Sequence, residues 1–227
     1  MGKLLWGYPP SVGEVGQRIL DGWAKEDRRQ GSRRQPLTLD LLKRVTHVLE
    51  SICYNEFECL LFRTLKSWMF FRAFRVSELL AARRHREVTW DDIAFGHGHL
   101  VVRIRSSKTD KQGFGARVVL AAYPDLEVCP IRWARELKKT ARERGQGVFR
   151  HQSGEGVSPH QLLGFLRAGL RRIGQNEVQF GTHSFWIGMA TEAGCRGWLD
   201  SHIMVLGRWK LGAYRRYVRK GSPGFAV

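Results

Sequence analysis

Apolar residues recur every three or four positions along most of the chain after residue 36, which is the spacing of one face of an α-helix. Thr38 and Ser158 stand where helix N-caps are expected, and Pro159 suits the first position of a helix. The pattern predicts helices over residues 39–52, 56–71, 76–82, 130–143, 159–173, 183–195, 199–206 and 213–218. Most of the chain is therefore expected to be helical.

The pattern changes between residues 100 and 120. Residues 100–104 and 117–120 are rich in β-branched and apolar side chains, while residues 106–115 between them are polar and contain two glycines. Such a sequence predicts two antiparallel strands joined by a long hairpin tip. The expected fold class is mainly α with one small antiparallel β-sheet (α+β), inserted between helices.

The first 36 residues lack this dense apolar pattern. Residues 12–23 suit a short helix, and residues 25–36, KEDRRQGSRRQP, are polar and basic without an apolar period. We interpret residues 1–36 as a linker and the remnant of an N-terminal region, with a nuclear-import or phosphate-contacting arm as the alternative for the basic stretch. Residues 37–227 are predicted to form one domain, which suits their length.

The net charge of the chain indicates which class of partner it binds. The chain has 38 Lys and Arg against 21 Asp and Glu, a net charge of +17. An excess of this size favours a polyanionic partner, with nucleic acid ahead of an anionic membrane surface. The four cysteines form no C-x-x-C pair, which is typical of reduced thiols inside a cell. No apolar stretch reaches the roughly 20 residues of a membrane span. We expect nucleic acid rather than a membrane as the partner, and we expect no secretion.

Four segments carry side chains that suit phosphate chemistry. Taken singly, each has an ordinary structural explanation. Arg75 in FRVSELL precedes a capped helix, Lys108 in SSKTDKQGFGA sits in a polar turn, and His183 and Trp186 in GTHSFWIGMATEAG share a helix face. The last segment, LGRWKLGAYRRYVR, reads as a basic amphipathic helix.

Together and in this order, the segments resemble the catalytic domain of the tyrosine recombinase (integrase) family, particularly the recombinases of DIRS-like and Crypton-like mobile elements of eukaryotes. The family pattern is an arginine in an R-x-S-E-L-like segment, a hairpin lysine, H-x-x-R, an L-G-[H/W/R-W] segment, and a tyrosine roughly nine residues beyond. The matching residues are Arg75, Lys108, His183, Arg208, Trp209 and Tyr217. The resemblance covers residues 35–219 and implies the tyrosine recombinase catalytic-domain fold.

The resemblance implies a function and a partner. The family binds double-stranded DNA, and breaks and rejoins its strands through a 3′-phosphotyrosyl intermediate during DNA recombination and integration, commonly with other recombinase subunits. It uses neither a metal nor a nucleotide cofactor, and we expect none here. A nuclear location would follow in a eukaryote, and a cytoplasmic one otherwise. The short segment between LGRW and Tyr217 favours a recombinase over a type IB topoisomerase.

The resemblance also implies a role for each matched residue. Arg75 and His183 would contact the oxygens of the phosphate, since catalysis at a phosphodiester relies on positioning and on fixed positive charge. Lys108 would protonate the leaving 5′-oxygen, with Lys111 as the alternative. Tyr217 would attack the phosphorus.

Two assignments near the C-terminal end stay open. Tyr217 lies nine positions after Arg208 and eight after Trp209, so either residue can fill the fifth position of the family's site. Tyr214 lies six positions after Arg208, a poorer match to the family spacing, and is predicted to pack rather than to attack DNA.

Trp186 departs from the family pattern, because it stands where H-x-x-R has its arginine. An indole has one N–H donor and no charge, so it does not replace a guanidinium. Only 36 residues precede the domain and ten follow Tyr217, which leaves little room for the family's clamping domain and exchanged tail. The alternatives to an active recombinase are therefore a catalytically impaired, DNA-binding derivative of a mobile-element recombinase and, third, a basic protein that binds RNA or membranes.

Overall fold

The computed structural model of the chain describes residues 34–81, 87–105, 114–141 and 145–209. The helices predicted over residues 12–23 and 213–218 and most of the hairpin tip lie outside these ranges. The helices are α2 (Leu39–His47), α3 (Glu56–Phe71), α4 (Val76–Leu79), α5 (Pro130–Lys139), α6 (Pro159–Arg172), α7 (His183–Cys195) and α8 (Asp200–Gly207). Short 3-10 turns are η1 (Val48–Ser51), η2 (Trp90–Asp92) and η3 (Glu177–Gln179), and the strands are β1 (Ile93–Phe95), β2 (His99–Ile104) and β3 (Ala116–Ala121).

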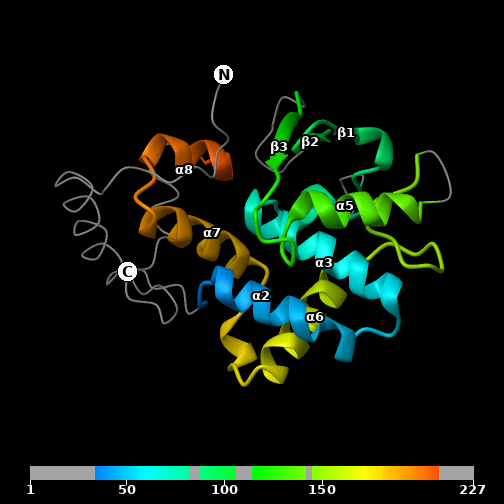
Figure 1. Ribbon diagram of the computed structural model, residues 1–227, viewed down its shortest axis with the longest axis horizontal. Coiled ribbons are helices and arrows are strands. Elements are labelled where there is room, and N and C mark those ends of the chain that lie inside the picture. Colours follow the sequence, from blue (N-terminus) through cyan, green and yellow to red (C-terminus); the bar gives the residue numbers. More distant parts are fainter. Residues whose placement is uncertain (1–33, 82–86, 106–113, 142–144, 210–227) are drawn as a thin grey trace.

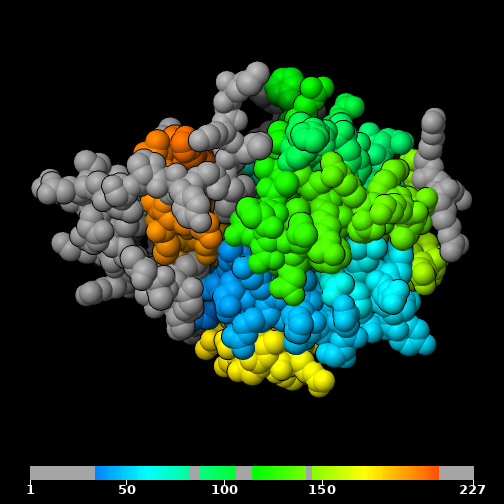
Figure 2. Space-filling view, in the orientation of Figure 1, coloured from blue at the N-terminus to red at the C-terminus, as the bar shows by residue number. Residues whose placement is uncertain are grey.

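Helix α3 runs through the middle of the molecule. Figure 1 shows α2 and α6 below it, α5 and the sheet above it, and α7 and α8 at the left end. Contacts of α3 with α5, α7 and α2 account for its burial. In the space-filling view, α2, α3 and α5 form one closely packed face (Figure 2).

Local capping explains where two helices begin. The Thr38 hydroxyl accepts a hydrogen bond from the Leu41 amide at 3.1 Å. The Ser158 hydroxyl accepts one from the Gln161 amide at 3.1 Å, and the Gln161 side chain accepts one from the Ser158 amide at 2.8 Å. Each cap satisfies donors that a helix leaves free in its first turn. Both predicted N-caps are therefore confirmed.

The predicted helix boundaries match for α3 and α7, are within one residue for α6 and α8, and are too long for α2, α4 and α5. Helix α2 ends at His47 and continues only as the 3-10 turn η1, and α5 ends at Lys139. Helix α4 ends at Leu79, since the backbone of the next residue, Leu80, is extended; both leucines are buried.

The predicted hairpin is present as two strands of a three-stranded antiparallel sheet in the order β1-β2-β3. Leu100 pairs with Leu120 and Val102 with Val118, and these four side chains are buried on one face. Strand β1 was not predicted, because its three residues are too few to show a period of two. The observed fold class is thus the predicted one, mainly helical with a small antiparallel sheet.

A second, smaller core lies between α7 and α8, apart from the main one. It contains Trp186, Trp209 and Ala73, together with Met189, Ala190, Ala193, Ile203 and Leu206. Helix α7 is apolar on every side and approaches the backbone of Leu37 closely. The Leu37 amide donates to the Ser184 carbonyl at 2.9 Å, which fixes α7 against the start of the domain.

The last residues of the predicted linker also pack against the domain. Arg34 donates from Nη1 to the carbonyl oxygens of Val178 and Phe180 at 3.0 and 2.9 Å. The boundary between linker and domain at residue 36 stays a prediction. Within the described ranges, no helix has both the length and the apolar character needed to cross a bilayer.

Candidate functional site

Five of the residues singled out in the sequence come together at one end of the molecule. Arg75 precedes α4, His183 and Trp186 lie in the first turn of α7, and Arg208 and Trp209 follow α8. The Arg75 guanidinium lies 4.8 Å from the centre of the Trp186 ring. The Trp186 ring stacks on His183 with 5.9 Å between centroids and meets Trp209 edge-on at 5.3 Å.

The remaining predicted residues cannot be placed in this way. Lys108, its rival Lys111, Tyr217 and its rival Tyr214 all lie outside the described residues. The roles implied for them stay predictions.

The centre of the cluster is Glu78, whose role the sequence did not reveal. Its carboxylate accepts from the Arg75 amide at 2.9 Å and from Arg75 Nη1 at 2.8 Å. On its other side it accepts from Arg208 Nη2 at 2.5 Å. The Glu78 side chain is only 1% exposed, so a buried carboxylate joins two guanidiniums that are far apart in the sequence.

The one signal for Glu78 in the sequence is local. It stands three positions after Arg75, where an acidic residue often caps a helix by accepting from the N-cap amide. That position predicts the bond to the Arg75 amide. It says nothing of Arg208, because that residue lies 130 positions away in the sequence and reaches Glu78 only through the fold.

A third guanidinium makes the cluster strongly positive. Arg72 is 9% exposed, and burial together with the nearby charge of Arg208 lowers its pKa to about 10. Burial and the charge of Arg75 lower the pKa of Arg208, while Glu78 opposes this effect. Arginine stays protonated at neutral pH even so. The cluster therefore contains three guanidiniums, and two of them pair with the single carboxylate of Glu78.

His183 is expected to be neutral at pH 7. Partial burial against Trp186, followed by repulsion from the Arg75 charge, lowers the pKa of the imidazole below its usual 6.5. A neutral imidazole carries one N–H donor. The ring can therefore donate one hydrogen bond to an anion without adding a charge.

Trp186 is built into the core of this site. Its side chain is largely buried, and its Nε1 donates to the Phe74 carbonyl at 3.0 Å. Its ring face supports the Arg75 guanidinium, an attraction of about 0.5–2 kcal/mol. The indole thus orients Arg75 and contributes no charge of its own.

The backbone on both sides of the cluster is unusual. Ala73 and Arg208 have φ of 43° and 53°, the left-handed region that residues other than glycine rarely adopt. Such residues cost about 1–3 kcal/mol each and concentrate at functional sites. At Arg208, this conformation lays the guanidinium over the Phe74 ring at 5.1 Å and beside Glu78.

The described residues offer no obvious metal site. No group of three or more His, Cys, Asp or Glu side chains in these ranges could hold a metal ion. His97 and His99 contact each other through a backbone oxygen, with His99 Nδ1 3.1 Å from the His97 carbonyl. The cluster around Glu78, with its three guanidiniums and one imidazole, is suited to binding an anion.

Comparison with known proteins places the fold. No protein-family model matches the sequence, and no curated protein matches it significantly. Among solved structures, the chain is similar to the XerH site-specific recombinase bound to difH substrate in a pre-cleavage complex, with 16% identity and a TM-score of 0.62 over 81% of this chain and 50% of that one. It is equally similar to the XerH post-cleavage complex with palindromic difH, with 16% identity and a TM-score of 0.62 over 82% and 50%.

A third similar structure is the Tn1549 transposon integrase, residues 82–397, in complex with circular intermediate DNA. The identity is 12% and the TM-score 0.55, over 86% of this chain and 63% of that one. The chain thus spans about half the length of the XerH chains it matches. These likenesses confirm the predicted fold, that of the tyrosine recombinase catalytic domain.

Proposed function

We propose that the chain is the catalytic domain of a tyrosine recombinase, which binds double-stranded DNA and cleaves and rejoins its strands. One observation carries the proposal: within this fold, Arg75 and Arg208 both pair with the buried Glu78, and His183 stacks on the Trp186 ring that supports Arg75. The arrangement supplies fixed positive charge and a neutral donor, the groups that a reacting phosphodiester needs. The similar XerH and Tn1549 structures hold DNA, which supports DNA as the partner.

In this proposal the reaction has two steps, strand cleavage and strand rejoining, and the second reverses the first. The Tyr217 oxygen attacks phosphorus while its phenolic proton passes to solvent water, the bond from phosphorus to the 5′-oxygen breaks, and Lys108 gives a proton to that oxygen. Arg75 and His183 bind the non-bridging oxygens as negative charge grows on them. Rejoining reverses these steps with a new 5′-hydroxyl, and the phosphotyrosyl bond conserves the energy of the broken one. No metal or nucleotide takes part.

The finer assignments rest on the sequence resemblance. An origin in a DIRS-like or Crypton-like mobile element, a nuclear location in a eukaryote and assembly with other recombinase subunits belong to the same proposal. The order of the four motifs along residues 35–219 supports the family resemblance from which these assignments follow.

A covalent adduct with DNA tests the proposal. The purified chain is incubated with a pool of nicked duplexes, from which the short cleaved strand diffuses away and leaves the protein attached. Tyr217→Phe is expected to abolish the adduct, because only the phenol oxygen can form the phosphotyrosyl bond. The matched control, Tyr214→Phe, should retain it. Loss of the adduct in Tyr214→Phe alone would reverse the assignment, and no adduct from the unmodified chain would contradict strand cleavage.

A second candidate function is DNA binding without catalysis. The observation that favours it is Trp186, which occupies the position of the family's second arginine with a neutral, buried ring. Loss of a preorganised donor costs about 10²–10³ in rate. If this substitution is the defect, Trp186→Arg should raise adduct formation at least about tenfold. Circular dichroism must show that the variant stays folded, since it loses the bond to Phe74.

A further inference from the structure

We infer that Arg208 acts with Arg75 as a two-guanidinium phosphate site, and that Arg208 supplies the second positive charge that Trp186 does not. The inference rests on the proposed function, because it names the scissile DNA phosphate as the ligand. The spacing to Tyr217 assigned Arg208 or Trp209 to the fifth position of the family's site, which is usually a histidine or tryptophan. The inference instead gives Arg208 the role of the arginine that Trp186 replaces.

The exposed fraction of the side chain distinguishes positions 208 and 186 as candidates for the second positive charge. The Arg75 and Arg208 side chains are 22% and 20% exposed, so part of each side chain is open to solvent. Trp186 is 5% exposed and lies beneath Arg75. A positive charge on residue 208 can therefore contact a bound anion, whereas the Trp186 side chain is buried beneath Arg75.

Glu78 places the two guanidiniums side by side. One carboxylate oxygen accepts from Arg75 Nη1 at 2.8 Å and the other from Arg208 Nη2 at 2.5 Å. Two arginines at this separation repel each other, and the shared carboxylate offsets the repulsion. The planar forks that remain suit the oxygens of a tetrahedral phosphate, which accept paired hydrogen bonds.

The local charge is not balanced by the residues that the structure describes. Arg72, Arg75 and Arg208 together carry three positive charges, and the one negative charge of Glu78 pairs with Arg75 and Arg208 only. In addition, Arg208 Nη1 is buried and has no hydrogen-bond partner within the described ranges. A buried donor left without an acceptor costs about 1–3 kcal/mol. An oxyanion bound here would accept from such a donor and neutralise the excess charge.

The site is preorganised before any ligand arrives. The left-handed backbone at Arg208, the Phe74 ring beneath its guanidinium and the ion pair to Glu78 fix the side chain. The Trp186 ring holds Arg75 in the same way. Donors that are already oriented are the ones that stabilise developing charge most effectively.

Phosphate binding can be measured without any DNA chemistry. Inorganic phosphate is titrated into the full chain at constant ionic strength, and NMR follows the Trp186 indole N–H and the His183 imidazole, which both lie in the cluster. Arg208→Gln is expected to raise the Kd for phosphate at least about tenfold, the loss of one charge-assisted pair of hydrogen bonds. The control Arg172→Gln, at the exposed end of α6, removes one charge elsewhere and should leave the Kd within about twofold.

Two results of this titration would overturn the inference. One is a Kd in Arg208→Gln that equals that of the unmodified chain. The other is no response of either signal up to about 100 mM phosphate, where a site with a millimolar Kd is filled. If Arg208→Gln does not fold, Arg208→Lys keeps the charge and removes the fork, and it should weaken binding at least about threefold. An unchanged Kd in this variant would also count against the inference.

The adduct assay separates this inference from the proposed function. If both hold, Arg208→Gln lowers adduct formation by roughly 10²–10³ while Arg172→Gln does not. If the unmodified chain binds phosphate through Arg208 but forms no adduct, the phosphate site stands and strand cleavage fails. If Arg208→Gln forms adduct as fast as the unmodified chain, cleavage stands and the role of Arg208 is wrong.

Discussion

Two buried ionisable side chains, Glu78 and Lys66, are held in very different ways. Glu78 accepts hydrogen bonds from the Arg75 amide and from two guanidiniums. Lys66, in the middle of α3, is fully buried, and its ammonium nitrogen has no hydrogen-bond partner among the described residues. Burial lowers its pKa to about 7, although Cys53 and Cys59 nearby oppose the shift. A buried charge without a partner is costly, so Lys66 weakens the fold at neutral pH.

Replacing this lysine should stabilise the protein. Lys66→Met keeps a long, flexible side chain in α3 and removes the charge, so we expect the free energy of unfolding at pH 7 to rise by roughly 1–4 kcal/mol. Urea denaturation followed by circular dichroism measures the change. A variant less stable than the unmodified chain at pH 7 would mean that Lys66 finds a partner in solution.

The pH dependence of the free energy of unfolding checks independently whether Lys66 destabilises the fold. The pKa of Lys66 is lower in the folded chain, about 7, than the 10.5 expected when unfolded, so the unfolded state binds more protons between these values. Stability should therefore rise with pH from 7 to 9, by about 1 kcal/mol per unit, and Lys66→Met should lack this slope. Above pH 9 the trend is opposed, because burial raises the pKa of Cys53 to about 12 and the unfolded thiol ionises first.

Among the helices, α7 does most to position the site, and its placement depends on a glycine. An added Cβ at Gly188 would lie 1.9 Å from the carbonyl oxygen of Leu37, which is backbone and cannot move aside. This close approach seats α7 against the start of α2. The same helix carries His183 and Trp186 in its first turn, so its position sets theirs.

A pair of glycine substitutions tests this placement. Gly188→Ala should destabilise the fold by about 2 kcal/mol or more, since α7 must shift away from Leu37. Gly164→Ala is the matched control, because Gly164 is exposed in α6 and a Cβ there meets nothing within 4 Å. It should stabilise by about 0.5–1 kcal/mol, the ordinary gain of alanine over glycine in a helix. Thermal unfolding compares the two, and equal effects would contradict the close approach.

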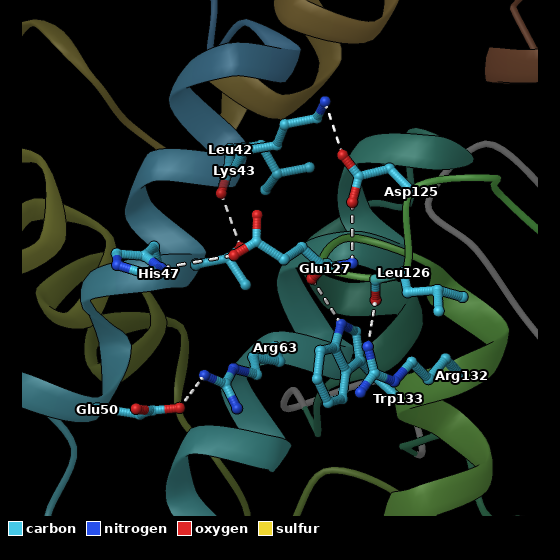
Figure 3. A network of polar contacts seen from close by, with 11 residues as sticks. Leu42, Lys43, His47, Glu50, Arg63, Asp125, Leu126, Glu127, Arg132 and Trp133 are labelled. Atoms are coloured by element: carbon cyan, nitrogen blue, oxygen red, sulfur yellow. Dashed lines mark hydrogen bonds and ion pairs between the residues drawn. The ribbon is translucent and has the colours of Figure 1, made fainter.

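Over the whole molecule, the positive charges differ in whether acidic residues already neutralise them. On the face of α2, α3 and α5, Lys43 pairs with Asp125 at 2.7 Å and Arg63 with Glu50 at 2.6 Å (Figure 3). The Asp125 hydrogen bond raises the pKa of Lys43, which favours the paired state. Trp133 lies between the guanidiniums of Arg63 and Arg132 in the same network.

The outer face of the sheet lacks such neutralisation. Arg103 on β2 lies directly opposite Arg117 on β3, both are exposed, and neither has an acidic partner in the part of the chain that the structure describes. Like charges in this arrangement destabilise a sheet. A polyanion bound at this face would remove the repulsion, so the sheet is the better candidate for contact with DNA phosphates.

Salt dependence of DNA binding tests this difference. With a net charge of +17, the chain should bind duplex DNA with an affinity that falls steeply with salt. The double variant Arg103→Gln/Arg117→Gln should reduce the slope of log K against log salt by up to about 1.8, or about 0.9 for each phosphate contact. The control Lys43→Gln/Arg63→Gln changes the net charge equally and should have little effect. Fluorescence anisotropy measures both, and equal slopes for the two double variants would rule out the sheet as the contact face.

The sequence by itself determined the elements whose signals are local. Helices α3 and α7 begin and end where the apolar spacing predicts, and Thr38 and Ser158 cap their helices, because caps and periodicity act within a few residues. The mainly helical class with a hairpin follows for the same reason. The segments that hold Arg75, His183 and Arg208 were also recognisable, since each carries a short motif.

Only the tertiary structure decided how these residues act on one another. Glu78 contacts Arg208 across 130 positions and so joins it to Arg75, and no local pattern contains a contact of that range. The sequence shows only that Trp186 replaces a charged residue of the family pattern. The fold shows that its ring supports Arg75 and that its Nε1 donates a hydrogen bond to the Phe74 carbonyl. These relations depend on the close approach of α7 to Leu37 and on the left-handed turn at Arg208, which follow from packing between distant segments rather than from the preferences of neighbouring residues.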